Sequence, residues 1–488
     1  MSVRIFVRGG GLLCLLAIAM NACADDGLAS YFDKALVNDP EFAAAQASYA
    51  AEVESRTIAR AGLLPSLNLS VEANSNRYQR QDTGIPTTRG FNYNTGTLGL
   101  RFNQPLFDLE RWANYREGDA RAGRADIVLA DARQNLALRL AETYFDYLLA
   151  FDTLELADAQ AQAVTAQRNR AENLFRGGAA TITDVEESKA QEQLASAQKF
   201  VAQNAITQRR RELSKLIGEL PALKPVADLG ASQQNPVSGH GSQPDESAHP
   251  AVGTAASKQF KGVMDAALQA RLSALVVPKL ELPEPNDLAA WTEAAQRNNL
   301  RVQSARALLA IAGFQRDRSR AGYFPKLALV AIHQDARHPN YLTDQDKNSR
   351  VGVELSMNLF AGGGTRGADR QSQAQYEKAR QELQTATQDA EIAASEAFLG
   401  VSSAVAQVRA LQQSLISAEI ALRGMEIGQK AGLRTNSEVL NAQQQLFSTT
   451  RDLQKAGYDY LLNRLRLQAV TGALSDEDVA RIDALRQP

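Results

Sequence analysis

The chain of 488 residues carries 53 basic and 55 acidic side chains, 44% hydrophobic residues, two cysteines and four histidines. This apolar fraction excludes a wholly disordered chain, and the length allows two or three domains of ordinary size. The near-zero net charge gives no sign of an electrostatic nucleic-acid binder, so we expect no nucleic-acid partner.

The N-terminus has the pattern of a secretory signal peptide. Arg4 and Arg8 precede an apolar run at 12–20, and an A-x-A cleavage site follows at 22–24. As a helix the apolar run would reach only about 14 Å, against a hydrocarbon core of ~30 Å. We therefore predict that residues 1–24 are removed on export. The alternative is a lipid-modified Cys23, although Met20-Asn21-Ala22 is a poor lipobox.

The most informative feature is an internal repeat. Residues 31–69 align without a gap on residues 291–329. Later landmarks recur in the same order: Gly99/Gly352, Phe107/Phe360, Gly178/Gly432, Thr181/Thr435 and Gly218/Gly472. This pattern indicates duplication of one unit rather than a short-period solenoid. The predicted organisation is a first unit at 25–227, a low-complexity insertion and equatorial linker at 228–286, and a second unit at 287–488.

Each unit is predicted to begin with a helix and continue into a β-hairpin. The helices cover 28–62 and 287–320, and each ends at Ala-Gly followed by a proline. Apolar and polar side chains then alternate, as in half-buried strands of about 10 residues. The apolar stripes contain Leu67, Leu69, Val71, Leu98, Leu100, Phe102, Leu327, Leu329, Val351, Val353 and Leu355. The polar segments 74–96 and 334–349 are predicted to be loops.

Two very long helices are predicted to follow the hairpins, at 108–175 and 365–430, where no proline occurs. Each would be a rod of about 100 Å that cannot fold alone. Shorter helices return over 181–218 and 435–472. We expect a tall helical coiled-coil barrel in which each long helix lies beside two stacked half-length helices, a returning helix and the next unit's opening helix.

The strands suggest a membrane role that one chain cannot fulfil alone. Glu72, Arg101 and Glu354 fall on the polar face, as expected for the water-filled lumen of a barrel. Four strands cannot close a barrel, and an open sheet edge in lipid is costly, so copies of the chain would have to combine. The alternative is a soluble periplasmic hairpin packed on helices.

Several of these landmarks match one family. GLRTNSEVLNAQQQ (432–445), GAATITDVEESKAQ (178–191), QPLFD (104–108), MNLFAGG (357–363) and YDYLLNRLRLQAVTGAL (458–474) resemble TolC-type outer-membrane export channels. The resemblance implies an α+β membrane protein: a homotrimer whose four strands per chain form a 12-stranded β-barrel in the outer membrane, above an α-helical tunnel through the periplasm. It also implies a periplasmic adaptor and an inner-membrane pump as partners.

The resemblance also implies positions for a gate. In this family the periplasmic tips of the helical hairpins close the tunnel through hydrogen bonds and salt bridges. The matching positions are Thr183 and Asp184 on the first tip and Arg434 on the second. Exposed ion pairs contribute only about 0 to 1 kcal/mol each, which suits a latch that a partner releases. The alternative for Asp184 is a helix-capping role.

Acidic residues at the tunnel constriction make family members cation-selective, and the matching positions are Glu438 and Asn441. The best-known form has two carboxylates three residues apart, so Asn441 is a departure that puts cation preference in doubt. Three Glu438 side chains in a trimer would still form a negative ring. The alternative is an ordinary exposed glutamate.

We expect neither catalysis nor a cofactor. Gly362, Gly364 and Gly367 fit G-x-G-x-x-G, but a Rossmann unit needs a second parallel strand nearby and a very long helix follows instead. His240 and His249 lack the spacing of a metal site. The predicted function is an outer-membrane exit duct fed by an ABC transporter in type I protein secretion. The alternatives are multidrug efflux with a proton-driven pump, or a non-conducting coiled-coil spacer or adhesin.

Overall fold

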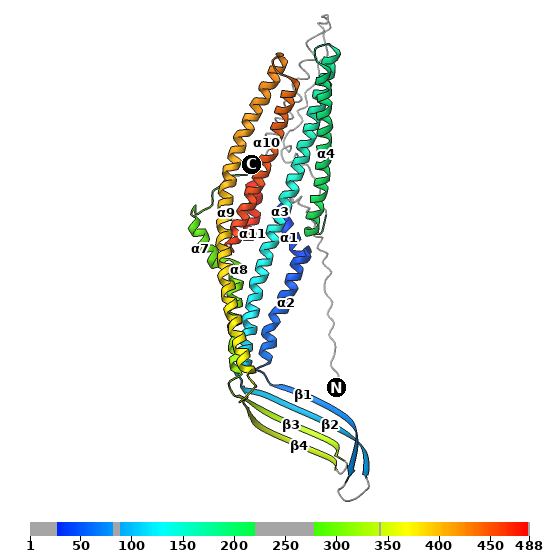
Figure 1. Cartoon of the computed structure of the whole chain (residues 1–488), viewed down its shortest axis with the longest axis vertical. Helices are drawn as coiled ribbons and strands as arrows, with labels where there is room; N and C mark the ends of the chain where they lie inside the picture. Colours follow the sequence, from blue (N-terminus) through cyan, green and yellow to red (C-terminus); the bar gives the residue numbers. More distant parts are fainter. Residues whose placement is uncertain (1–26, 82–87, 220–277, 341–342, 487–488) are drawn as a thin grey trace, which may run out of the picture.

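The computed structural model describes residues 27–81, 88–219, 278–340 and 343–486. The predicted signal peptide with Cys23, the segment 228–260 and both of its histidines lie outside the described residues. Figure 1 shows an elongated molecule with a curved β-sheet at one end and two helical hairpin tips at the other. The long helices connect the two ends.

Each predicted opening helix is two helices in the structure. The first divides into α1 (Leu28–Asn38) and α2 (Pro40–Ala61), and the second into α7 (Leu288–Asn298) and α8 (Leu300–Ala321). The break follows from local capping. Asp39 accepts a hydrogen bond from the Phe42 amide and precedes a proline, which disfavours helical geometry at Asp39. Asn299 caps α8 in the same way through the amides of Arg301 and Val302.

The four strands form one antiparallel sheet in the order β1-β2-β3-β4. They span β1 Ser66–Gln81, β2 Thr88–Phe107, β3 Lys326–Asn340 and β4 Thr343–Ser356. The strands are therefore longer than predicted, and most of the two predicted loops is strand. Antiparallel pairing uses backbone groups alone, so it continues into segments whose side chains are polar on both faces.

The register confirms which side chains share a face. Opposite residues of an antiparallel pair point the same way, and Asn68 pairs with Arg101, which pairs with Ile332. Through these pairs Glu72, Arg101 and Glu354 lie on one face of the sheet. The other face carries the apolar stripes next to the helices. Most of these side chains are exposed in the single chain, Val71 to 75%, whereas Phe102, Leu327 and Leu329 are half-buried.

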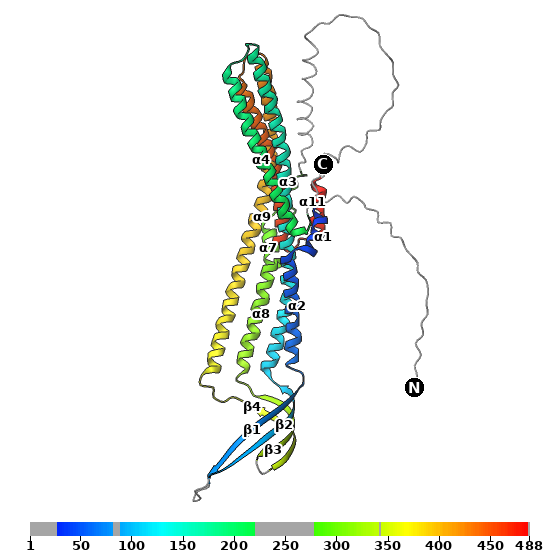
Figure 2. The same cartoon turned by 90° about the vertical axis from the view of Figure 1, so that its right-hand side faces the viewer.

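The long helices match the prediction closely. They are α3 (Leu109–Arg176) and α9 (Gly364–Lys430), and the returning helices are α4 (Ile182–Ile217) and α10 (Asn436–Val470). A further helix, α11 (Asp476–Arg486), was not predicted and lies beside α1 at mid-height (Figures 1 and 2). The largest hydrophobic cluster is at this level, where α1, α3, α4, α9, α10 and α11 contribute side chains.

Each long helix does lie beside two shorter stacked helices, but the stacking partner differs from the prediction. The end of α4 meets the end of α1 from its own unit, where the Asn38 side chain donates to the Ile217 carbonyl at 3.0 Å. The end of α10 meets the α7–α8 junction in the same way, through Asn299 and the Val470 carbonyl at 2.8 Å. Each returning helix therefore stacks on the opening helices of its own unit. The reason is that Asn38 and Asn299 each donate a hydrogen bond to a carbonyl group at the C-terminus of that returning helix.

Candidate functional site

The two helical tips are built by the same turn. At the first, Gly178 has φ of +75°, and the Ala179 amide donates to the Leu174 carbonyl at 2.8 Å. At the second, Gly432 has φ of +73°, and the Leu433 amide donates to the Gly428 carbonyl at 2.9 Å. This is the Schellman arrangement, and glycine suits its left-handed position. Both tips are therefore tight turns of defined geometry.

A capping box starts the returning helix at each tip. The Thr181 hydroxyl accepts from the Asp184 amide at 3.2 Å, while the Asp184 carboxylate accepts from the Thr181 amide at 2.9 Å. Thr435 and Glu438 form the same box on the second tip, with the Thr435 amide donating to Glu438 at 2.7 Å. Both carboxylates predicted to act in the gate or constriction therefore also hold a helix terminus, so the capping role expected as an alternative for Asp184 is present.

Within the described part of one chain, Arg434 forms no ion pair or hydrogen bond with Asp184 or Thr183. Arg434 instead forms a salt bridge with Glu438, with Nη1 and Oε1 2.7 Å apart. Asp184 is engaged in its capping box, and Thr183 is exposed on the first turn of α4. Hydrogen bonds from the Thr435 backbone, and then from the Arg434 guanidinium, lower the pKa of Glu438 below its ordinary value. Glu438 is therefore held in its charged form.

Asn441 is exposed one helical turn after Glu438 on α10. Its neutral side chain adds no charge to this face. The structure thus brings together Arg434, Glu438 and Asn441 on one tip, and places Thr183 and Asp184 on the other.

Sequence reasoning missed a buried polar cluster that joins the two hairpins of one chain. The Asn436 amide donates to the Ser188 hydroxyl at 2.7 Å, and its carbonyl oxygen accepts from Gln167 at 2.5 Å and from Gln429 at 3.2 Å. Asn436 and Ser188 are 8% and 0% exposed. Buried polar groups are costly unless paired, so this cluster fixes the register of α3, α4 and α10 near the tips. The only sequence signal was a run of polar residues at positions that face a helix neighbour.

The opposite end of the molecule carries the other predicted site. Glu72, Arg101 and Glu354 are exposed on the polar face of the sheet, and Glu72 accepts a hydrogen bond from Asn74 at 2.9 Å. None of the helices among the described residues combines the length and the apolar character needed to cross a membrane. The glycines that fit G-x-G-x-x-G belong to the joint between β4 and α9, where Gly362 and Gly363 have positive φ and no parallel strand is near in the described sheet.

Comparison with known proteins identifies the class. The model of the outer membrane efflux protein family matches residues 31–219 and 291–473, and the chain belongs to this family. The alkaline protease secretion protein AprF of Pseudomonas aeruginosa is 29% identical over 466 residues, which cover 94% of this chain and 87% of AprF. The outer membrane protein TolC of Vibrio cholerae is 27% identical over 467 residues, covering 94% and 93% of the two chains.

A solved structure has the same fold. The outer membrane protein VceC from Vibrio cholerae superposes with a TM-score of 0.68 at 18% identity, over 91% of this chain and 96% of VceC. The protein is thus an outer-membrane channel that extends through the periplasm, in a family that works with adaptor and inner-membrane pump partners in tripartite export. The family is one of export ducts, not of enzymes.

Proposed function

We propose that this protein is the homotrimeric exit duct of a type I secretion system, which passes an exported protein from an inner-membrane ABC transporter and a periplasmic adaptor to the outside. One observation supports the assignment as a membrane-spanning duct. The sheet has one apolar and one polar face and leaves β1 and β4 with unpaired edges. In lipid an unpaired edge leaves backbone groups unsatisfied, so β1 of one copy pairs with β4 of the next.

Three copies give the 12 strands that the TolC-type resemblance implies. An exposed apolar stripe along α9 supports this assembly. Ile392, Leu399, Ile420 and Ile427 are separated by multiples of seven residues and are 57%, 57%, 68% and 61% exposed in the single chain. Apolar side chains at heptad spacing pack against another helix in coiled coils. Glu72, Arg101 and Glu354 then line the lumen, because their face is opposite the apolar one.

The gate lies at the tips in this proposal. Asp184 of one protomer pairs with Arg434 of its neighbour, with Thr183 beside them. Both side chains already have partners in their own chain, so the additional contact changes the free energy little and a docked adaptor can release it. The ring of three Glu438 carboxylates, next to the neutral Asn441, forms the constriction.

Current through single channels tests the duct and its gate. Purified protein in a planar bilayer should conduct in uniform small steps, and Asp184→Asn combined with Arg434→Gln should enlarge them. Asparagine still accepts the capping hydrogen bonds, so the helix terminus is kept. The matched control is Glu186→Gln with Lys189→Gln, which removes a 2.8 Å ion pair on the same helix. If the inserted protein does not conduct, the result would support a non-conducting coiled-coil spacer. If the control also gives larger steps, Asp184 and Arg434 do not form the latch.

We infer a protein cargo because AprF, a relative of this chain, is named for protease secretion. Export assays test this inference. A strain that lacks this protein should lose a specific protein from the culture medium, and the wild-type chain should restore it. Sensitivity to drugs should not change. A strain that becomes drug-sensitive but keeps all its exported proteins would instead identify a multidrug efflux duct.

A further inference from the structure

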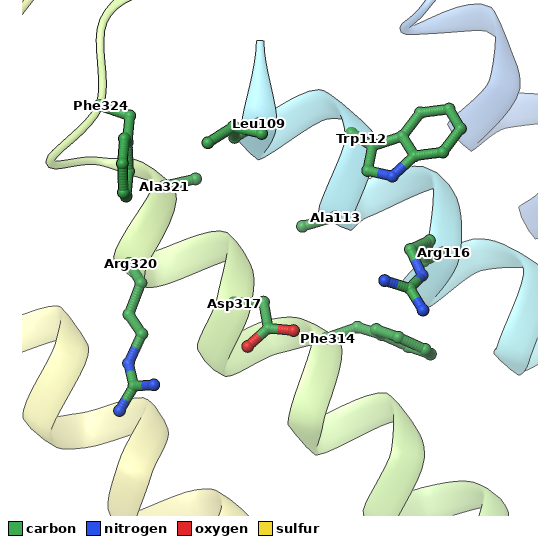
Figure 3. Close-up of a pocket in the computed structure, with 9 residues that line it drawn as sticks. All are labelled: Leu109, Trp112, Ala113, Arg116, Phe314, Asp317, Arg320, Ala321 and Phe324. Carbon is green, nitrogen blue, oxygen red and sulfur yellow. The ribbon is translucent and has the colours of Figure 1, made fainter.

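A pocket of about 190 Å³ lies where the helices meet the sheet. It is formed by the first two turns of α3, the last two turns of α8 and Phe324, which follows α8 (Figure 3). The lining residues that carry polar or aromatic groups are Trp112, Arg116, Phe314, Asp317, Arg320 and Phe324. Neither the gate nor the lumen uses these side chains.

The pocket opens on the outer side of the helical wall. Glu110 forms a 2.5 Å ion pair with Lys326, which alternation places on the polar face of the sheet with Ala328 and Glu354. The pocket residues of α3 are at 109, 112, 113 and 116, about a third of a turn away from the Glu110 side. They thus lie away from the side of α3 that meets the polar face of the sheet. The inference rests on the proposed duct, in which the inner-leaflet headgroups of the outer membrane lie at the end of the sheet next to the helices.

In the proposed trimer, a second copy of the chain does not cover this position. The helices near the sheet contact one another in the order α2, α3, α8, α9. A neighbouring protomer adds at the ends of this row, beside α2 and α9. The groove between α3 and α8 is internal to the row and stays open to the membrane.

The pocket combines an apolar wall with charges of both signs. Trp112 and Phe324 are 52% and 50% exposed, as aromatic side chains are at membrane interfaces. Arg116 stacks over the ring of Phe314 at 4.8 Å, and Figure 3 shows Asp317 on α8 between Phe314 and Arg320.

Arg320 is paired with Asp369 at 3.2 Å. Asp317 is paired with Arg316 at 3.2 Å through one carboxylate oxygen, Oδ1, and its side chain is 47% exposed. Arg116, by contrast, stacks on a ring and leaves its guanidinium hydrogen-bond donors for an anion. The Arg116 guanidinium and the second carboxylate oxygen of Asp317 therefore remain at the pocket mouth.

We propose that this pocket binds the headgroup of a phospholipid that carries both a phosphate and a primary ammonium group. Arg116 binds the phosphate and Asp317 accepts from the ammonium. Trp112 and Phe324 contact the glycerol and the first acyl carbons. The volume is below the ~300 to 1,000 Å³ of pockets that enclose a whole small ligand, so the acyl chains continue along the apolar face of the sheet.

Tryptophan fluorescence tests this site directly. The chain has two tryptophans, so Trp291→Phe leaves Trp112 as the single reporter. This protein is reconstituted in vesicles that contain a small fraction of phospholipid with brominated acyl chains, which quenches nearby indoles. Brominated phosphatidylethanolamine should quench about two- to fivefold more strongly than brominated phosphatidylglycerol at the same fraction, the range expected for an exposed ion pair.

Substitutions assign the preference to the two charges. In the single-tryptophan background, Arg116→Gln should weaken quenching by both lipids, and Asp317→Asn should abolish the preference for phosphatidylethanolamine. Arg366→Gln is the matched control, since Arg366 is exposed at the start of α9, at the same height. Equal quenching by the two lipids, a preference that survives Asp317→Asn, or a control that behaves like Arg116→Gln would each overturn the proposal. Channel conductance is independent of all these outcomes.

Discussion

Single residues decide how closely the helices approach. Gly118 of α3 is buried against α2, and a Cβ atom built there would lie 2.5 Å from the Ala59 Cβ and 2.7 Å from the Ser55 carbonyl oxygen. The absence of a side chain at this point sets the distance between α2 and α3. A Cβ atom built at Gly123, only five residues further along the same helix, would have nothing within 4 Å.

The pair gives a matched test of helix packing. Gly118→Ala should destabilise the protein by about 1–3 kcal/mol, because the added methyl group overpacks the contact with α2. Gly123→Ala should stabilise it by about 0.5–1 kcal/mol, because alanine favours the helix more than glycine does. Chemical denaturation of the two variants measures both values. Equal effects would show that helix propensity, not packing, governs this part of α3.

At the scale of elements, each returning helix begins with a capping box whose carboxylate, Asp184 or Glu438, is also a charged group of the helical tip. Thr435 caps α10, and Glu438 completes the box while it pairs with Arg434. These bonds lower the pKa of Glu438, so the stabilisation they give is complete above the ordinary value of 4.5 and is lost as the pH falls through the lowered value.

Capping and charge can be separated by substitution. Glu438→Gln keeps the box, since glutamine also serves at this position, but removes the charge and should reduce cation preference of the channel with little change in stability. Thr435→Val should cost about 1 kcal/mol and leave the charge in place. Reversal potentials in a salt gradient measure the preference, which in the wild type should persist below pH 4.5. An unchanged reversal potential in Glu438→Gln would place the constriction elsewhere.

At the scale of the whole molecule, one chain leaves too much apolar surface and backbone uncovered to be complete. In the proposed trimer, a helix of the neighbouring copy covers the α9 stripe and lipid covers the apolar face of the sheet. An assembly in which each copy covers its neighbour satisfies the stripe and closes the strand edges together.

Association should therefore depend on the stripe. Ile420→Glu places a charge where the neighbouring helix packs and should cause the oligomer to dissociate at lower temperature in mild detergent, since burying an unpaired charge costs several kcal/mol. Ile420→Leu keeps an apolar side chain of equal size and should leave the oligomer intact. The mass of the detergent-solubilised particle measures both. An intact oligomer with Ile420→Glu would mean that the stripe contacts something other than a second copy.

The sequence alone determined the features that depend on local interactions. Helix propensity and the absence of proline set the long rods of α3 and α9, glycine and threonine set the tips, and alternation set the faces of the sheet. Tertiary structure decided what depends on groups distant in sequence: which helix stacks on α4, how far backbone pairing extends the strands, and the cluster of Asn436, Ser188 and Gln167. A local pattern reports the preference of a segment for its own conformation, whereas these contacts depend on the partner that folding brings to each surface.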